Sequence, residues 1–183
     1  MLILASLSPI RAQILRDFGI DFVQKSVDFD EDSLTLTAPK SFAYKACVGK
    51  LERALELFGK ESKILVADSV VSVGGILQRK PRDLEQARAM LESQNDATIH
   101  IITAQILKSP KIELCDISQA SFALGKFDPI ELEEYLHSRS WEGKAGGVMM
   151  EGFHGRYIRE QRGLLSTAMG LSLEKFLPFF EII

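Results

Sequence analysis

Hydrophobic positions follow two different periods along this chain, and the period changes from segment to segment. Apolar runs and alternating stretches predict strands over residues 2–5, 21–27, 64–73, 98–107, 112–124 and 156–160. Stripes at three- and four-residue spacing predict helices over residues 9–18, 39–58, 84–91, 129–137 and 172–180. Strands and helices are interspersed and no segment repeats, so the pattern predicts one mixed α/β domain over residues 1–183.

Local signals mark where several of these elements begin and end. Ser8 is a favoured N-cap and is followed by Pro9, a favoured first helical residue. Gly59 is expected to end the long helix, and the turn at residues 109–111 is expected to join two paired strands. Near residues 125–128 we expect the chain to cross between two lobes.

Asp68 lies inside the predicted strand over residues 64–73, which is otherwise mostly aliphatic. Side chains alternate between the two faces of a strand, so Asp68 shares a face with Ile64, Val66 and Val70. An unpaired carboxylate on a buried face is costly. We therefore expect Asp68 to meet cationic side chains or a metal ion.

Composition narrows the classes of function. The chain is 46% hydrophobic and 26% charged, with a net charge of −3, which is typical of a soluble globular protein. The acidic balance argues against a nucleic-acid partner. The N-terminal apolar run lacks a basic region and is too short for a signal peptide or membrane span. Cys47 and Cys115 have no metal-like spacing and are expected to be buried thiols, which fits a reducing cytoplasm.

The segment from Ser6 to Arg11 predicts an anion site. A strand, a tight turn and a helix N-terminus present backbone N–H groups that favour phosphate. The Ser6 and Ser8 hydroxyls add donors, and Arg11 can bind phosphate oxygens with its planar fork. A capped helix with a surface arginine gives the same pattern, so the segment alone does not decide between the two.

Two lysines occupy unusual local settings. Lys50 lies four residues from Ala46 and from Ala54, on the apolar stripe of its helix. It either extends back to solvent or reaches into a cleft. Lys80 precedes Pro81, which favours an extended backbone and suits a phosphate contact, although surface lysines in loops are common.

A glycine-rich region over residues 143–155 contains Lys144 and Glu151. Such a region lets the backbone approach a ligand closely, or it is simply a flexible loop. His100 and His137 are expected to be structural. No metalloprotease, Walker or nucleophile-elbow motif is present.

Taken in order, these motifs resemble the Maf family of nucleoside triphosphate pyrophosphatases. The resemblance extends nearly from end to end, as far as Gly170-Leu171. The motifs that carry it are Ser6-x-Ser8-Pro9-x-Arg11, Asp30-Glu31, Lys50, Ala67-Asp68-x-Val70-Val71, Lys80-Pro81-x-Asp83, Lys144-Ala145-Gly146 and Glu151-Gly152.

The resemblance implies hydrolysis of a nucleoside triphosphate between its α- and β-phosphates, with Mg²⁺ or Mn²⁺ as cofactor. It implies a single Maf-like domain in which a long mixed sheet is flanked by helices, with two lobes around a deep cleft. This fold is similar to that of inosine triphosphate pyrophosphatases. The family is cytoplasmic, removes non-standard or excess nucleotides and, in some bacteria, arrests septum formation. The alternative is a non-catalytic, nucleotide-sensing regulator of septum formation.

The resemblance also assigns roles to residues. Asp68 matches the base that activates water, and Lys50 and Lys80 match catalytic, phosphate-binding cations. Glu31 and Asp68 match the acidic residues at the metal. The remaining matches are to substrate-binding positions, namely Ser6, Ser8, Arg11, Lys144 and Glu151.

Departures from the family pattern leave the base preference open between pyrimidine and modified purine nucleotides. Ile10 stands where the family often has arginine, and Glu151 where pyrimidine-type enzymes carry glutamine. Phe176, Phe179 and Phe180 form either core or the surface of a homodimer, and their helical spacing favours core.

Overall fold

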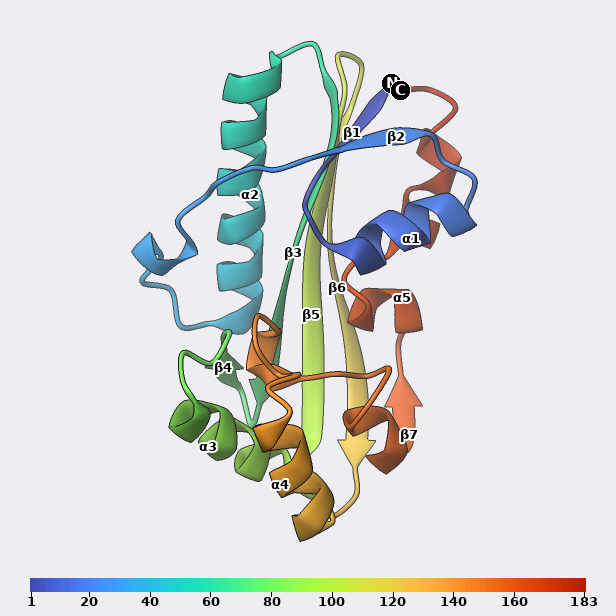
Figure 1. Cartoon of the computed structure of the whole chain (residues 1–183). Coiled ribbons are helices and arrows are strands. Elements are labelled where there is room, and N and C mark those ends of the chain that lie inside the picture. The colour runs from blue at the N-terminus through green and yellow to red at the C-terminus, as the bar shows by residue number, and fades with distance from the viewer.

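The computed structural model describes residues 1–183 and is built around a seven-stranded mixed sheet (Figure 1). Along the sheet the strand order is β2-β1-β3-β5-β6-β7, and β4 pairs with β3 off this path. β1 is parallel to both β2 and β3, whereas every other pair is antiparallel. The strands are β1 Leu2–Ala5, β2 Phe22–Lys25, β3 Lys63–Val73, β4 Ile76–Gln78, β5 Thr98–Lys108, β6 Glu113–Leu124 and β7 Ile158–Arg162.

Helices cover both faces of this sheet. In Figure 1, α2 runs along one side of the long strands, α1 and the C-terminal segment lie on the other, and α3 and α4 lie at the lower end. The α-helices are α1 Pro9–Asp17, α2 Pro39–Phe58, α3 Leu84–Gln94, α4 Pro129–His137 and α5 Leu165–Ala168. Short 3₁₀ turns cover Glu31–Ser33, Ala145–Gly147, His154–Tyr157, Leu173–Lys175 and Leu177–Phe179.

Three apolar clusters fill the space between the helices and the sheet. The side chains of Ile64, Val66 and Val70 pack beneath α2 against Phe42 and its neighbours. The opposite face of β3 is divided between a cluster beneath α1 and the C-terminal segment and a cluster beneath α3 and α4. Asp68 belongs to the face that α2 covers, as its alternation with the aliphatic residues predicted.

The edge of β3 is open in its middle. β1 pairs with β3 only over residues 63–65, and β4 pairs only over residues 71–73. Residues 66–70, which include Asp68, therefore have a partner strand on one side only, β5. This break gives a side chain in the centre of the sheet access to a cavity.

The expectation of a mixed α/β sheet flanked by helices is confirmed. The helix expected over residues 172–180 is wrong, because two 3₁₀ turns replace it. Pro178 has no N–H to donate and disfavours helical backbone in the residue before it, so a continuous helix does not form. Phe176 is buried in the core cluster beneath α1, and Phe180 packs against it.

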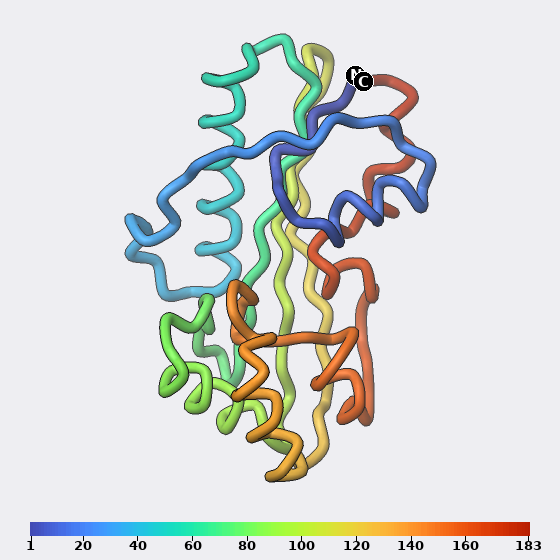
Figure 2. Tube along the Cα trace, in the orientation of Figure 1, coloured from blue at the N-terminus to red at the C-terminus, as the bar shows by residue number.

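The burial expected for both cysteines holds only for Cys47, since Cys115 is exposed. Cys115 lies on β6, in a row with Glu113 and Ile117 that is exposed throughout. The chain trace in Figure 2 brings the two termini to the same end of the sheet. Lys63, which pairs with Leu2, also donates a hydrogen bond to the carbonyl of Ile183 at 2.8 Å. None of the helices is both long and apolar enough to span a bilayer.

Candidate functional site

A cavity of about 370 Å³ lies at the open edge of β3. Its walls come from the β1–α1 turn, α2, β3, the loop after β4, the glycine-rich region and the segment before Gly170. One part of the lining is polar and charged, and the other is apolar. The charged and hydroxyl side chains are Ser6, Ser8, Arg11, Lys50, Asp68, Ser69, Lys80, Lys144 and Glu151.

Lys50 connects two carboxylates at the centre of the site. Its Nζ lies 2.5 Å from Oδ1 of Asp68 and 2.7 Å from Oε1 of Glu31. The side chain is 16% exposed, so Lys50 reaches into the cleft and does not extend back to solvent. The other oxygen of Asp68, Oδ2, accepts no hydrogen bond from the protein and is not sealed from the cavity. One carboxylate oxygen therefore remains available to a ligand or a water molecule.

Burial and charge act in opposite directions on these groups. Burial raises the pKa of Asp68, Lys50 opposes the change and Glu31 adds to it, so the pKa lies above the usual value for aspartate. Burial lowers the pKa of Lys50, but attraction to Asp68 and Glu31 outweighs it, so the pKa is raised. Burial raises the pKa of Glu31, but attraction to Lys50 and Lys80 outweighs it, so the pKa is lowered. Asp68 is thus a stronger base than an ordinary aspartate.

Arg11 is held by four acceptors. Nε donates to the carbonyl of Gly170 at 2.8 Å, and Nη1 donates to the carbonyl of Ala67 at 2.9 Å and to Oγ of Ser6 at 3.2 Å. Nη2 donates to Oγ of Ser69 at 3.1 Å. Burial lowers the pKa of Arg11, although Asp68 opposes the shift. Four of its five N–H groups are used, so Arg11 contributes a fixed positive charge and one remaining donor.

The turn between β1 and α1 has the geometry that the sequence predicted. The Ser8 hydroxyl oxygen accepts from the N–H of Arg11 at 3.3 Å, which caps α1. The Ser6 hydroxyl oxygen accepts from the N–H of Ser8 at 3.3 Å. In both residues the hydroxyl hydrogen is free of these bonds and can donate to an anion in the cavity.

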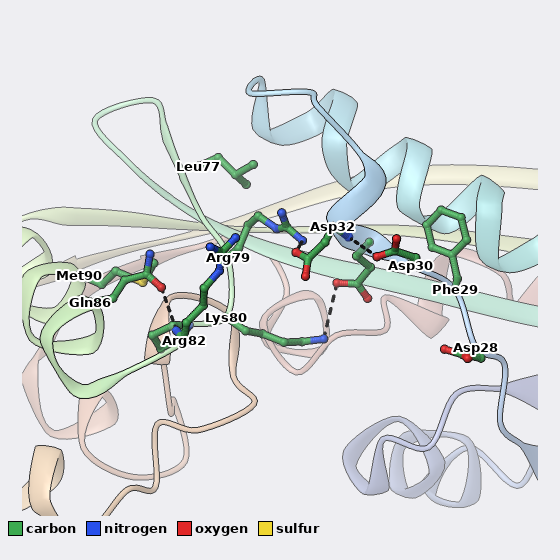
Figure 3. Close-up of a pocket in the computed structure, with 12 residues that line it drawn as sticks. Asp28, Phe29, Asp30, Asp32, Leu77, Arg79, Lys80, Arg82, Gln86 and Met90 are labelled. Carbon is green, nitrogen blue, oxygen red and sulfur yellow. Dashed lines mark hydrogen bonds and ion pairs between the residues drawn. The ribbon is translucent and has the colours of Figure 1, made fainter.

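A second cavity of about 610 Å³ adjoins this site, between the acidic loop at residues 28–32 and the loop after β4. Figure 3 shows the side chain of Lys80 reaching across it. Nζ of Lys80 lies 3.6 Å from Oε2 of Glu31. Beside it, Nη2 of Arg79 lies 2.5 Å from Oδ1 of Asp32. The Arg79 guanidinium also stacks over the ring of Phe42, 4.8 Å from its centre. The two ion pairs hold the acidic loop against the loop that contains Lys80.

Lys144 and Glu151 lie on the wall of the first cavity but outside the charged cluster. Nζ of Lys144 donates to the carbonyl of Ser140 at 2.6 Å, which ties the amine to its own segment. Glu151 is exposed and forms no ion pair. The structure thus brings together Ser6, Arg11, Lys50 and Asp68, and leaves Lys144 and Glu151 at the rim.

The two carboxylates around Lys50 offer oxygen ligands of the type that a divalent cation takes, but not a complete metal site. No group of three or more His, Cys, Asp and Glu side chains is arranged to hold a metal ion on its own. Asp68 and Glu31 nevertheless each have a second carboxylate oxygen that Lys50 does not bind. Mg²⁺ commonly binds through one or two carboxylates together with substrate phosphates and water.

Comparison with protein families gives a match over residues 1–182 to the model described as Maf-like protein. The chain belongs to the Maf-like family. Among curated relatives, a protein of Helicobacter pylori is 46% identical over 99% of this chain and 95% of its own length. A Nitratiruptor protein is 43% identical over 96% of both chains, and a Campylobacter jejuni protein is 36% identical over 95% of this chain and 97% of its own. All three are named nucleoside triphosphate pyrophosphatase.

A solved structure described as a nucleoside-triphosphatase and dITP/XTP pyrophosphatase from Mycobacterium abscessus aligns with 98% of this Maf-like chain and 96% of its own. The TM-score is 0.48 and the sequence identity is 17%.

Sequence reasoning missed the residues that fix Arg11 in this Maf-like chain. Ser69 binds Arg11 and also shares a hydrogen bond of 2.8 Å with Thr103, its cross-strand partner on β5. Thr103 in turn donates to the carbonyl of Thr167 at 2.8 Å. The sequence does show a hydroxyl residue inside each of two apolar strands, which was the available signal. Only the register between β3 and β5 shows that the two hydroxyls meet.

Proposed function

We propose that this chain hydrolyses nucleoside triphosphates to a monophosphate and pyrophosphate. The observation that carries the proposal is the carboxylate of Asp68, buried at the open edge of β3 with one oxygen bound by Lys50 and the other free. The names of the relatives support the same activity. In this proposal residues 1–183 act as one catalytic unit.

The mechanism follows from the charges around Asp68. Asp68 takes a proton from a water molecule, and the water oxygen attacks the α-phosphorus. The bond between that phosphorus and the oxygen bridging to the β-phosphate breaks, and pyrophosphate leaves. A positioned base of this kind contributes a factor of about 10²–10⁴. The raised pKa of Asp68 favours proton transfer from water.

Cations around the cavity neutralise the triphosphate. Arg11, Lys50 and Lys80 come from three different elements and line the same cavity. The hydroxyls of Ser6 and Ser8 and the first turn of α1 add donors. Phosphoryl transfer requires mainly positioning and charge stabilisation, which such a set provides.

A divalent cation completes the proposed site. Asp68 and Glu31 are the residues that would hold Mg²⁺ or Mn²⁺, and the bound ion would neutralise phosphate charge. The apolar part of the cavity, formed by residues such as Val71, Ile101 and Met150, suits the flat ring of a base. We propose a pyrimidine or non-standard nucleotide as the substrate, with removal of such nucleotides as the cellular role.

Release of pyrophosphate from a panel of nucleotides tests the activity. The panel contains dTTP, UTP, CTP, 7-methyl-GTP, ITP and the standard ribonucleotides, each with magnesium or manganese and with a chelator control. In water labelled with a heavy oxygen isotope, attack at the α-phosphorus places the label in the monophosphate. Label in pyrophosphate, or release of single phosphate, would contradict the mechanism. Tight nucleotide binding without any turnover would favour a sensor.

A further inference from the structure

A chain of buried polar side chains lies behind the glycine-rich wall of the cavity. Gln94, at the end of α3, and His154 are both completely buried, and Gln78, at the end of β4, is 6% exposed. Nε2 of His154 lies 2.7 Å from Oε1 of Gln94. Nε2 of Gln94 donates to Oε1 of Gln78 and to the carbonyl of Gly146, both at 2.8 Å.

The hydrogen bonds determine which group of this buried network donates and which accepts. The N–H of Met149 can only donate, so Nδ1 of His154 is its acceptor at 3.1 Å. The proton of the neutral imidazole therefore lies on Nε2, which donates to Gln94. Burial among Phe127, Tyr135 and Phe153 lowers the pKa of His154 to about 3, in agreement with a neutral ring.

These bonds secure one segment of the wall at both ends. Gly146 is held at its carbonyl by Gln94 and at its N–H by the carbonyl of Arg79 at 2.9 Å. At the other end, the N–H of His154 donates to the carbonyl of Met149 at 3.1 Å, while the imidazole accepts from the N–H of Met149. Between these points lie Val148, Met150 and Glu151, which line the cavity.

We propose that His154 is a positioning residue, which by linking Gln94 to Met149 fixes the wall segment at residues 146–152 where the nucleoside part of the substrate binds. The inference rests on the proposed function for its ligand, whereas the link itself is a property of the free protein. His154 lies behind the wall, completely buried, so it acts through the segment and does not touch the substrate.

A side chain at position 154 that only filled space would not need these hydrogen bonds. An aliphatic side chain would pack among the same aromatic rings, but it would leave Oε1 of Gln94 and the N–H of Met149 without a partner. In the series of hydrogen bonds that runs from Gln78 through Gln94 and His154 to Met149, each donor instead has a specific acceptor. Fully satisfied buried networks of this kind select one conformation.

Two substitutions separate the two bonds of the imidazole. The amide of His154→Gln can place an N–H where Nε2 lies and keep the bond to Gln94. The shorter His154→Asn can place an oxygen where Nδ1 lies, so it accepts from Met149 but does not reach Gln94. The backbone N–H of residue 154 still donates to the carbonyl of Met149 in both variants. The bond to Gln94 is therefore what ties this end of the segment to α3, while Gln94 holds Gly146 at the other end. We expect His154→Gln to behave like the native protein and His154→Asn to lose the fixed wall at this end.

Steady-state kinetics and hydrogen exchange test the proposal. For His154→Asn we expect KM to rise about tenfold, as for one lost buried hydrogen bond, with kcat within about threefold of native. Amides at residues 146–152 other than Met149 should exchange faster in free His154→Asn and at the native rate in His154→Gln. The Met149 amide is left out of this comparison because it loses its acceptor, Nδ1 of His154, in His154→Gln. Leu107→Ala, in the core beneath α1, is a control for lower stability alone.

Native KM in His154→Asn would overturn the proposal, as would an equal rise of KM in Leu107→Ala. Native exchange at residues 146–152 in His154→Asn would overturn it as well. If the native protein hydrolysed no nucleotide, the proposed function would fail, and the exchange measurement on the free proteins would still decide whether His154 fixes the segment.

Discussion

Nζ of Lys50 lies 2.5 Å from Oδ1 of Asp68, although the two residues belong to α2 and β3 and are 18 positions apart. Lys50 faces the sheet because it follows the buried stripe of α2, with Ala46 and Ala54 one turn away on either side. Asp68 reaches the cavity because neither β1 nor β4 covers residues 66–70. The buried stripe of α2 and the uncovered stretch of β3 thus bring the two charged side chains together at the centre of the site.

Asp68→Asn should nearly abolish turnover and leave the fold intact. Asparagine has the same shape and can still accept a hydrogen bond from Lys50, but it does not take a proton from water. We expect kcat to fall by a factor of about 10²–10⁴. Pyrophosphate release measures the rate, and circular dichroism checks the fold. A fully active Asp68→Asn protein would exclude Asp68 as the base.

Lys50→Met and Glu31→Gln should shift the pKa of Asp68 in opposite directions. Lys50 lowers this pKa and Glu31 raises it. Loss of the lysine should therefore raise the pKa further, and loss of the glutamate should bring it closer to the ordinary value. An NMR titration of the Asp68 carboxyl carbon in metal-free protein measures both changes. Shifts of the same sign in both variants would contradict the electrostatic account.

Arg11→Lys should destabilise the protein although the charge is kept. A lysine ammonium donates from one point and does not span the carbonyls of Ala67 and Gly170 together with Ser69. We expect the free energy of unfolding to fall by about 2–4 kcal/mol. Arg53→Lys, at an exposed ion pair on α2, should change it by less than about 0.5 kcal/mol. Urea unfolding of both variants measures these free energies. An equal loss in Arg11→Lys and Arg53→Lys would contradict the structural role of Arg11.

Gly146→Ala should destabilise the protein more than Gly143→Ala. Both glycines have positive φ, 59° at Gly146 and 71° at Gly143, so both substitutions cost about 1–2 kcal/mol from backbone strain. Only at Gly146 would a Cβ meet a neighbour, 2.9 Å from Cβ of Val71. We expect Gly146→Ala to lose about 1–3 kcal/mol more in the free energy of unfolding. An equal loss in both would show that Val71 moves aside freely.

Protonation of His154 should make the protein sensitive to mild acid. Its pKa is about 3 in the folded protein and 6.5 without the fold, so the unfolded chain takes up the proton first. The contribution of neutral His154 to stability is complete above pH 6.5 and is lost as the pH falls toward 3. By pH 5 the loss is roughly 2 kcal/mol.

His154→Gln does not titrate, so it should lose less stability than the native protein between pH 7 and pH 5. Urea unfolding at the two pH values measures the difference. The carboxylates are common to both proteins, so their effects cancel in the comparison. An identical loss in both proteins would show that folding does not lower the pKa of His154.

Several elements were predictable from the sequence because their signals are local. The cap at Ser8, the alternation around Asp68 and the apolar stripe containing Lys50 each depend on residues within a few positions. One failure was also local, because the spacing of the C-terminal phenylalanines favoured a helix but Pro178 breaks it into two turns. Cys115 is exposed because β6 has an uncovered row, which its own sequence does not reveal.

The sequence by itself determined the mixed α/β class, the order of its elements and the Maf-like set of charged residues. Only the tertiary structure decided that Lys50 lies between Glu31 and Asp68, that β3 has an open edge, and that His154 and Gln94 meet. The physical reason is the range of the interactions. Helix and strand periods arise from neighbouring residues, whereas strand register, sheet coverage and hydrogen bonds join segments up to 159 positions apart.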